Sequence, residues 1–66
     1  MKNNLKVQRA ILNITQNELA EKAGVSRQTI NTIESGKYIP STVLALKLAK
    51  IFRANVEEIF LLEPGD

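Results

Sequence analysis

The sequence predicts an all-α domain of five short helices within its 66 residues. Apolar residues recur every three to four positions, which is the spacing of one face of a helix. Ser, Thr and Asn, whose side chains cap helix N-termini, precede most of these segments, and only a few residues join one segment to the next. The alternating pattern of a half-buried strand is almost absent. We therefore expect residues 1–66 to form a single domain with mostly local contacts.

The first helix is expected from about Asn4 to Leu12, because Leu5, Arg9 and Leu12 fall on one stripe. Asn13 can end this helix, since asparagine tolerates the left-handed conformation that closes many helices.

The second helix is predicted to begin at Thr15, which stands three residues before Glu18 in the spacing of a capping box. Gly24 supplies the turn that ends it. The residues expected on its inner face are Leu19, Ala20 and Ala23.

Ser26 is the expected cap of a third helix from about Arg27 to Ser35, which Gly36 ends. At 100° per residue, Ile30 and Ile33 fall together on one side of this helix. The opposite arc carries forked polar side chains, namely Arg27, Gln28, Asn31 and Thr32.

Pro40 prevents the third helix from continuing, and Ser41 caps a fourth helix that runs to about Phe52. Its predicted inner face comprises Ala45, Leu48, Ala49 and Phe52. Asn55 and Glu58 repeat the capping-box spacing at the start of a short fifth helix. The remaining tail, "LLEPGD", shows too little periodicity to predict more than a short strand.

The composition excludes several classes of function. The chain has no cysteine and no histidine, which removes disulfides, soft metal sites, cysteine nucleophiles and the usual general base. Glu57 and Glu58 are adjacent, so their side chains diverge by about 100° and cannot act together on one substrate. We expect no enzyme activity, cofactor, metal or small-molecule ligand. No apolar run approaches the length of a membrane span, and the N-terminus lacks a signal-peptide core, which favours a soluble cytoplasmic protein.

The positive charge is concentrated in the first part of the chain. Residues 1–37 carry six Lys or Arg against three Glu, whereas residues 38–66 carry three against four acidic residues. The basic excess therefore accompanies the third helix and its polar arc.

The second and third helices are separated by little more than "AGVS". A small residue at Ala20, a glycine at Gly24 and an apolar residue at Val25 let two helices cross closely at a steep angle. This is the spacing of a helix-turn-helix, in which the start of the second helix of the pair can enter a duplex major groove about 12 Å wide.

The polar arc of the third helix then has a candidate role in reading base edges. Gln28 can bind adenine through N6 and N7, and Arg27 can bind guanine through O6 and N7. Asn31 and Thr32 lie one turn deeper. The groups suited to phosphate are Gln16 and Asn17 at the start of the second helix, and Thr29, Lys37 and Tyr38 beside the third.

Taken together, these residues resemble the phage lambda-type repressor and Cro helix-turn-helix proteins, the XRE family, over nearly the whole chain. The segments that carry the resemblance are "ITQNELAEKAGVSRQTINTIESGKYIPS", "LKLAKIF" and "NVEEIF". The resemblance implies a five-helix domain that binds operator DNA as a two-fold dimer. It also implies an ion pair between Arg9 and Glu34, and DNA contacts from Gln16, Arg27, Gln28, Thr32 and Lys37.

Two positions depart from the pattern of the family. Thr42 stands where an apolar residue is common, and Arg53 stands where glycine usually ends the fourth helix. A non-glycine residue in a left-handed cap costs roughly 1 kcal/mol, which favours another geometry for Arg53 and a looser corner there.

The C-terminal quarter predicts a homodimer that binds a palindromic operator, with half-sites roughly 34 Å apart. Exposed apolar groups near the chain end usually mark an interface, and the residues expected there are Val56, Phe60, Leu61 and Leu62. The alternative is that Leu61 and Leu62 fold back against "MKNNL" as a short strand pair, which could itself form part of the interface.

The main functional hypothesis is a sequence-specific transcriptional regulator of double-stranded DNA. The short chain without an attached sensing domain favours a minimal repressor, although the sequence does not distinguish repression from activation. Two other interpretations stay open. The polar arc could be an ordinary solvated helix face, or the protein could be an adaptor, such as an antitoxin, that binds a partner protein through helical grooves.

Overall fold

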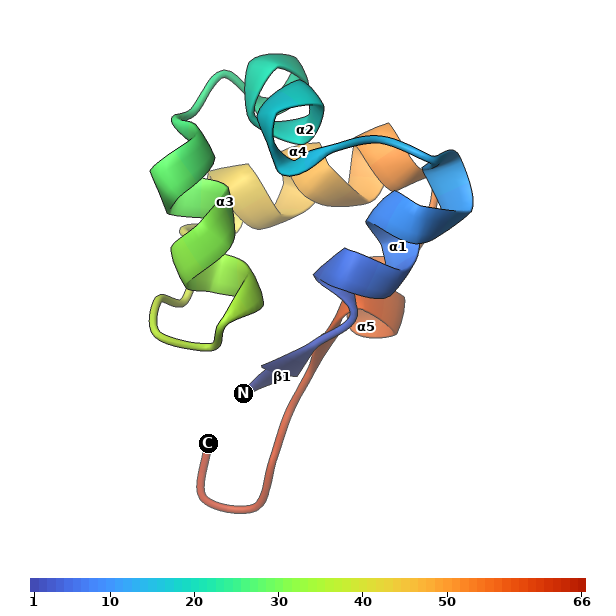
Figure 1. Cartoon of the computed structure of the whole chain (residues 1–66). Helices are drawn as coiled ribbons and strands as arrows, with labels where there is room; N and C mark the ends of the chain where they lie inside the picture. The colour runs from blue at the N-terminus through green and yellow to red at the C-terminus, as the bar shows by residue number, and fades with distance from the viewer.

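The computed structural model describes residues 1–66 and confirms the predicted all-α class (Figure 1), including the short terminal strand pair that the sequence allowed. Most of the chain is helical. The helices are α1 (Leu5–Leu12), α2 (Gln16–Ala23), α3 (Arg27–Glu34), α4 (Thr42–Phe52) and α5 (Val56–Ile59), and the strands are β1 (Lys2–Asn3) and β2 (Phe60–Leu61).

The helices surround one core of 12 buried apolar residues. Helix α4 passes behind α2 and α3, while α1 and α5 close the other side (Figure 1). Every helix contributes at least one side chain that is almost completely buried, so the loss of any one of them would open a cavity in a small core. These side chains are Leu5, Leu19, Ile30, Ile33, Leu48 and Ile59.

The predicted capping hydrogen bonds are present at the N-termini of α2, α3 and α4. In α2, Thr15 Oγ1 accepts from the Glu18 N–H at 3.0 Å, and Glu18 Oε1 accepts from the Thr15 N–H at 2.9 Å. The hydrogen bond from the Thr15 backbone lowers the pKa of the Glu18 carboxyl. Ser26 and Ser41 cap α3 and α4 through their hydroxyl groups. The local sequence signals therefore define where these helices begin.

The inner faces of α1 and α4 differ in part from the prediction. Leu12 is 42% exposed instead of buried, because only the first turn of α1, at Leu5, enters the core while the end of the helix lies at the edge of the molecule (Figure 1). In α4, Leu44 is buried although the sequence did not single it out, and Ala45 is half-buried. Both differences arise because the angle at which a helix packs against its neighbours decides which of its apolar residues are buried.

Arg53 adopts the left-handed conformation, with φ 53° and ψ 42°, so the expectation of another geometry was wrong. Two hydrogen bonds close the end of α4, from the Arg53 N–H to the Lys50 carbonyl at 3.2 Å and from the Ala54 N–H to the Ala49 carbonyl at 3.1 Å. This is the double closure that normally accompanies a C-terminal glycine. The hydrogen bonds and the packing of α5 thus hold Arg53 against its steric preference.

The two strands pair antiparallel, with Lys2 opposite Leu61 and Asn3 opposite Phe60. The fold-back alternative is therefore correct for Leu61. It is wrong for Leu62, which follows β2 and is 82% exposed, because the ladder is only two residues long. The Asn3 side chain also donates to the Ile33 carbonyl at 2.8 Å, which attaches the strand pair to the end of α3.

Replacement of Arg53 by glycine is expected to stabilise the fold by about 0.5 to 1 kcal/mol, because glycine adopts φ 53° without steric strain. The gain corresponds to a rise of about 4 °C in the midpoint of thermal unfolding, measurable by circular dichroism. The matched control is Asn13→Gly at φ 56°, where the gain should be smaller because asparagine already tolerates this region. An Arg53→Gly variant no more stable than the wild type would contradict the strain assigned to Arg53.

Candidate nucleic-acid interface

Helices α2 and α3 cross closely at a turn that begins at Gly24. Gly24 has φ 73°, and the following Val25 N–H donates to the Ala20 carbonyl at 3.0 Å, which closes the end of α2. Ala20 and Ala23 are almost fully buried. Their small side chains let the two helices approach each other, as the helix-turn-helix spacing predicted.

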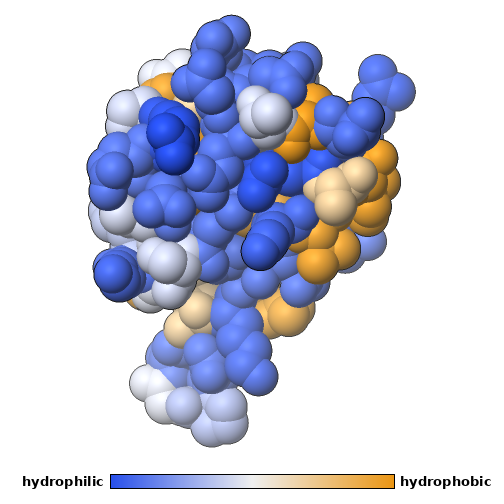
Figure 2. Space-filling model, viewed as in Figure 1, coloured by the Kyte–Doolittle hydropathy of each residue, from blue (hydrophilic) through white to orange (hydrophobic).

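Helix α3 presents its polar arc on the outside of the molecule. Ile30 and Ile33 are buried, whereas Arg27, Gln28 and Asn31 are exposed, as predicted. The face that carries α2 and α3 is largely hydrophilic, and apolar surface gathers on the side of α1 (Figure 2). The exposed face of α3 is therefore suited to a polar partner.

The hydroxyl groups of Thr32 and Thr29 are less available to an outside partner than the sequence suggested, and both residues are half-buried. The Thr32 hydroxyl lies 3.0 Å from the carbonyls of both Gln28 and Thr29 and donates within its own helix. What Thr32 can offer outward is a methyl group and an acceptor. The Thr29 hydroxyl lies 2.9 Å from Ser26 Oγ and belongs to the cap of α3.

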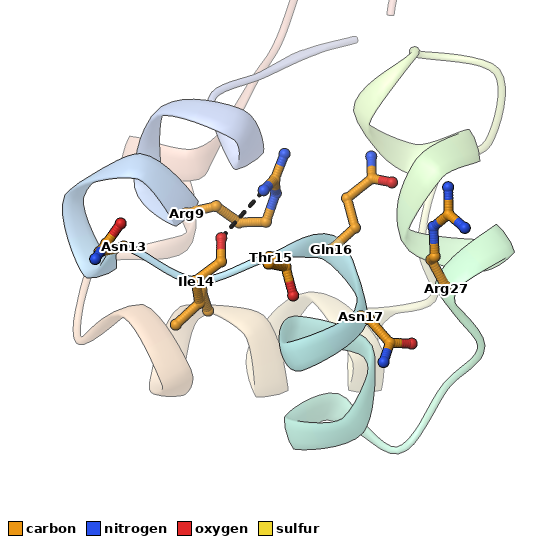
Figure 3. A pocket seen from close by; sticks show the side chains of 7 residues that line it. All are labelled: Arg9, Asn13, Ile14, Thr15, Gln16, Asn17 and Arg27. Carbon is orange, nitrogen blue, oxygen red and sulfur yellow. Dashed lines mark hydrogen bonds between the residues drawn. The ribbon is translucent and has the colours of Figure 1, made fainter.

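A depression of about 570 Å³ lies where the start of α2 meets the start of α3 (Figure 3). The first N–H groups of α2 have no partner within the helix and carry the positive end of its dipole. The Arg27 side chain extends from α3 into the lining of this depression, so Arg27 belongs to it as well as to the polar arc (Figure 3). The lining residues are Arg9, Asn13, Ile14, Thr15, Gln16, Asn17 and Arg27.

Asn13 and Thr15 line this depression although the sequence analysis did not select them. Both had already been explained as residues that end and begin helices. Their contribution to the depression follows from the path of the α1–α2 connection, which local spacing does not specify. A search for polar residues on both sides of a predicted helix start would have found them.

The ion pair between Arg9 and Glu34 is confirmed and joins α1 to the end of α3. Arg9 Nε donates to Glu34 Oε2 at 2.5 Å and Nη2 donates to Oε1 at 3.1 Å. Arg9 Nη1 also donates to the Ile14 carbonyl at 3.1 Å, the hydrogen bond drawn in Figure 3. The side chains of Arg9 and Glu34 are only 15% and 8% exposed. Hydrogen bonding to Glu34 raises the pKa of Arg9 above its ordinary value, so the guanidinium stays charged.

Gln16 and Asn17 make side-chain contacts that the sequence did not reveal. Gln16 Nε2 donates to Glu34 Oε1 at 3.2 Å and to Asn31 Oδ1 at 3.3 Å, so its amide bridges α2 and α3. Asn17 Nδ2 donates to Glu21 Oε1 at 3.4 Å within α2. The Glu18 N–H is taken by Thr15 Oγ1, so the N–H groups of Gln16 and Asn17 are those left free at the start of α2.

Lys37 and Tyr38 lie in the connection after α3, and both are exposed. Gly36 has φ 79°, and the Lys37 N–H donates to the Thr32 carbonyl at 3.0 Å, which turns the chain sharply at the end of α3. These two residues therefore lie at the opposite end of α3 from the depression beside α2, as the sequence predicted.

The four residues predicted for a dimer interface differ in exposure. Phe60 is buried in the core of its own chain and Val56 is half-buried, whereas Leu61 is 38% and Leu62 is 82% exposed. A second depression, of about 250 Å³, adds apolar surface nearby. Its lining residues are Met1, Ile39, Pro40, Thr42, Ala45, Leu46, Val56 and Phe60.

Comparison with known proteins identifies the family. Residues 5–59, which include all five helices, match the family described as Helix-turn-helix. The chain belongs to the XRE-type helix-turn-helix family. Members of this family bind DNA and regulate transcription, and they are not enzymes.

The relatives of this helix-turn-helix regulator come from archaea and bacteria. It is 59% identical over 66 residues, the full length of both chains, to an uncharacterized HTH-type transcriptional regulator of Methanocaldococcus jannaschii. It is 48% identical over 63 residues to one from Archaeoglobus fulgidus, covering 96% of this chain and 89% of the relative. The regulator YgzD of Bacillus subtilis is also 48% identical over 63 residues, with 96% of each chain covered. No helix of this regulator is long and apolar enough to cross a membrane.

Arg9→Ala is expected to lower the free energy of unfolding by about 2 kcal/mol, because it leaves the nearly buried Glu34 carboxylate without its charged partner. Urea unfolding followed by circular dichroism measures the change. Lys6→Ala removes an exposed cation from the same helix and should change stability by less than about 0.5 kcal/mol. Equal stability of the two variants would mean that the ion pair does not secure α1.

Proposed function

We propose that the protein is a cytoplasmic repressor that binds a palindromic operator as a homodimer, with α3 of each subunit in the major groove of one half-site. The observation that carries this proposal is the arrangement around α3. Exposed hydrogen-bonding side chains occupy its outer face, a largely polar depression of about 570 Å³ lies at its start, and an exposed lysine lies at its end. This arrangement supports base reading between two backbone contacts.

The base contacts are assigned to the exposed arc. Gln28 has its amide on the surface and can make the paired contact that adenine N6 and N7 require. Asn31 lies one turn further along the helix. Thr32 contributes its methyl group, which suits the methyl group of thymine, because its hydroxyl proton is held within α3.

The backbone contacts are assigned to both ends of α3. At its start, a phosphate in the 570 Å³ depression would meet the free N–H groups of Gln16 and Asn17 and the guanidinium of Arg27. At its end, Lys37 and Tyr38 would bind the backbone on the other side of the groove. Repression then needs no further chemistry, because a dimer bound across a promoter blocks the access of polymerase.

The dimer is assigned to the C-terminal end of the chain. Leu61 and Leu62 are exposed apolar residues, and the residue before them, Phe60, lines an apolar depression together with Val56. A two-fold axis through this region would give each operator half-site its own α3. A single short helix makes too few base contacts for tight specificity, and two related helices double that number.

Gln28→Ala and Lys37→Ala should weaken DNA binding in different ways. Loss of Gln28 should cost about 1 to 3 kcal/mol on the preferred operator and relax the preference at one base position. Loss of Lys37 should weaken binding to all sequences alike and reduce the slope of log affinity against log salt by about 1, since it removes one phosphate contact.

The measurement is binding to a selected operator and to random duplex DNA over a range of salt concentrations. Equal losses for Gln28→Ala on both DNAs would argue against base reading. A wild-type protein that bound neither DNA would favour the adaptor hypothesis instead.

The double substitution of Leu61 and Leu62 by glutamate should convert the dimer to a monomer, because it places like charges in the proposed apolar contact. Sedimentation equilibrium measures the mass, and affinity for a palindromic site should fall in parallel. The control is Ile11→Glu, which changes an apolar residue of similar exposure on α1 and should leave the dimer intact. A double variant that still sediments as a dimer would place the interface elsewhere.

A further inference from the structure

We infer that the Arg9–Glu34 ion pair fixes the hydrogen-bond polarity of two amides at the reading surface, so that Asn31 presents a donor to the DNA and selects guanine over adenine. Three contacts carry this inference: Arg9 to Glu34, Glu34 to Gln16, and Gln16 to Asn31. It rests on the proposed function, since the polarity of Asn31 affects binding only when α3 lies in the major groove.

The first step is the carboxylate of Glu34. Arg9 donates to both of its oxygens, and the Glu34 side chain is 8% exposed, so little water competes for them. A carboxylate in this ion pair accepts hydrogen bonds and cannot donate them. Any amide atom that lies against Glu34 Oε1 must therefore be the nitrogen.

The second step is the amide of Gln16. Its Nε2 lies 3.2 Å from Glu34 Oε1, and a flipped amide would bring two acceptors together at this distance. The same nitrogen lies 3.3 Å from Asn31 Oδ1. Both N–H groups of Gln16 are thus in use, and the group left for the DNA is the carbonyl oxygen. A side-chain hydrogen bond from Gln16 to a phosphate would require these contacts to break.

The third step is the amide of Asn31. Because Gln16 donates, the nearer atom of Asn31 must be its oxygen, and the Nδ2 group is left on the exposed side of α3. Adenine needs both a donor and an acceptor from an asparagine, and the hydrogen bond from Gln16 turns the Asn31 oxygen toward α2, away from a base edge that meets Nδ2. Guanine presents two acceptors, O6 and N7, which match the outward-facing Nδ2 donor. Asn31 is therefore a specificity-determining residue, and Gln16 is the positioning residue that acts through it.

The first test is made in the absence of DNA. NMR should find that the side-chain amide protons of Gln16 exchange with water more slowly than those of the exposed Gln28, and that Glu34→Gln abolishes the difference. Equal exchange of Gln16 and Gln28 in the wild type would overturn the inference, whatever the protein binds.

The second test selects bound sequences from a random duplex pool. The wild type should prefer guanine over adenine by about tenfold at one position, and Gln16→Met should reduce this preference to about twofold because the Asn31 amide can then flip. Asn31→Asp replaces the free donor by an acceptor and should shift the choice toward cytosine, whose N4 donates. The matched control is Gln8→Met, which makes the same substitution at a glutamine of α1 that has no proposed DNA contact and should leave the base preference unchanged.

The outcomes separate this inference from the proposed function. If Gln16→Met weakens binding to every sequence equally and leaves the base preference unchanged, Gln16 is a phosphate contact and the inference fails while DNA binding stands. If the wild type selects no duplex sequence at all, the proposed function fails and the reading role of Asn31 fails with it, even where the amide exchange of Gln16 is slow.

Discussion

The position of the first helix depends on one ion pair. Helix α1 enters the core through Leu5, while its other large apolar side chains, including Leu12, remain exposed, so apolar packing alone holds it weakly. Arg9 adds three hydrogen bonds, two to Glu34 at the end of α3 and one to the Ile14 carbonyl before α2. A partly buried ion pair contributes little net stability because both charges lose water, but it specifies one geometry, since either charge left alone there is costly. The α1–α2 connection and the end of α3 are therefore held in one arrangement.

The candidate DNA-binding surface is built on that arrangement. Ala20 and Ala23 let α2 and α3 cross closely, and Gly24 turns the chain between them. The close crossing brings the start of α2 beside Arg27, which forms the depression proposed to bind a phosphate. It also brings Gln16 within hydrogen-bond distance of Asn31, so the groups proposed to position the protein on DNA and those proposed to read the bases are joined by hydrogen bonds.

The small core explains the apolar surface that remains. Five short helices cannot cover one another completely, and apolar side chains stay exposed on α1 and near the C-terminus. The strand pair uses the backbone of Leu61 and leaves Leu62 outside. Through Asn3, the same strand pair reaches the Ile33 carbonyl at the end of α3. The strand pair at the C-terminal end of the chain is thus joined to α3 by a hydrogen bond.

The sequence by itself determined the five helices, their caps at Thr15, Ser26 and Ser41, and the helix-turn-helix, because these depend on residues within a few positions of one another. The family resemblance added the Arg9–Glu34 pair. Only the tertiary structure decided which part of each apolar stripe is buried, the conformation of Arg53, and the bridge from Gln16 to Asn31. These features depend on the angles at which helices pack and on contacts between residues distant in the chain, and no local spacing encodes either.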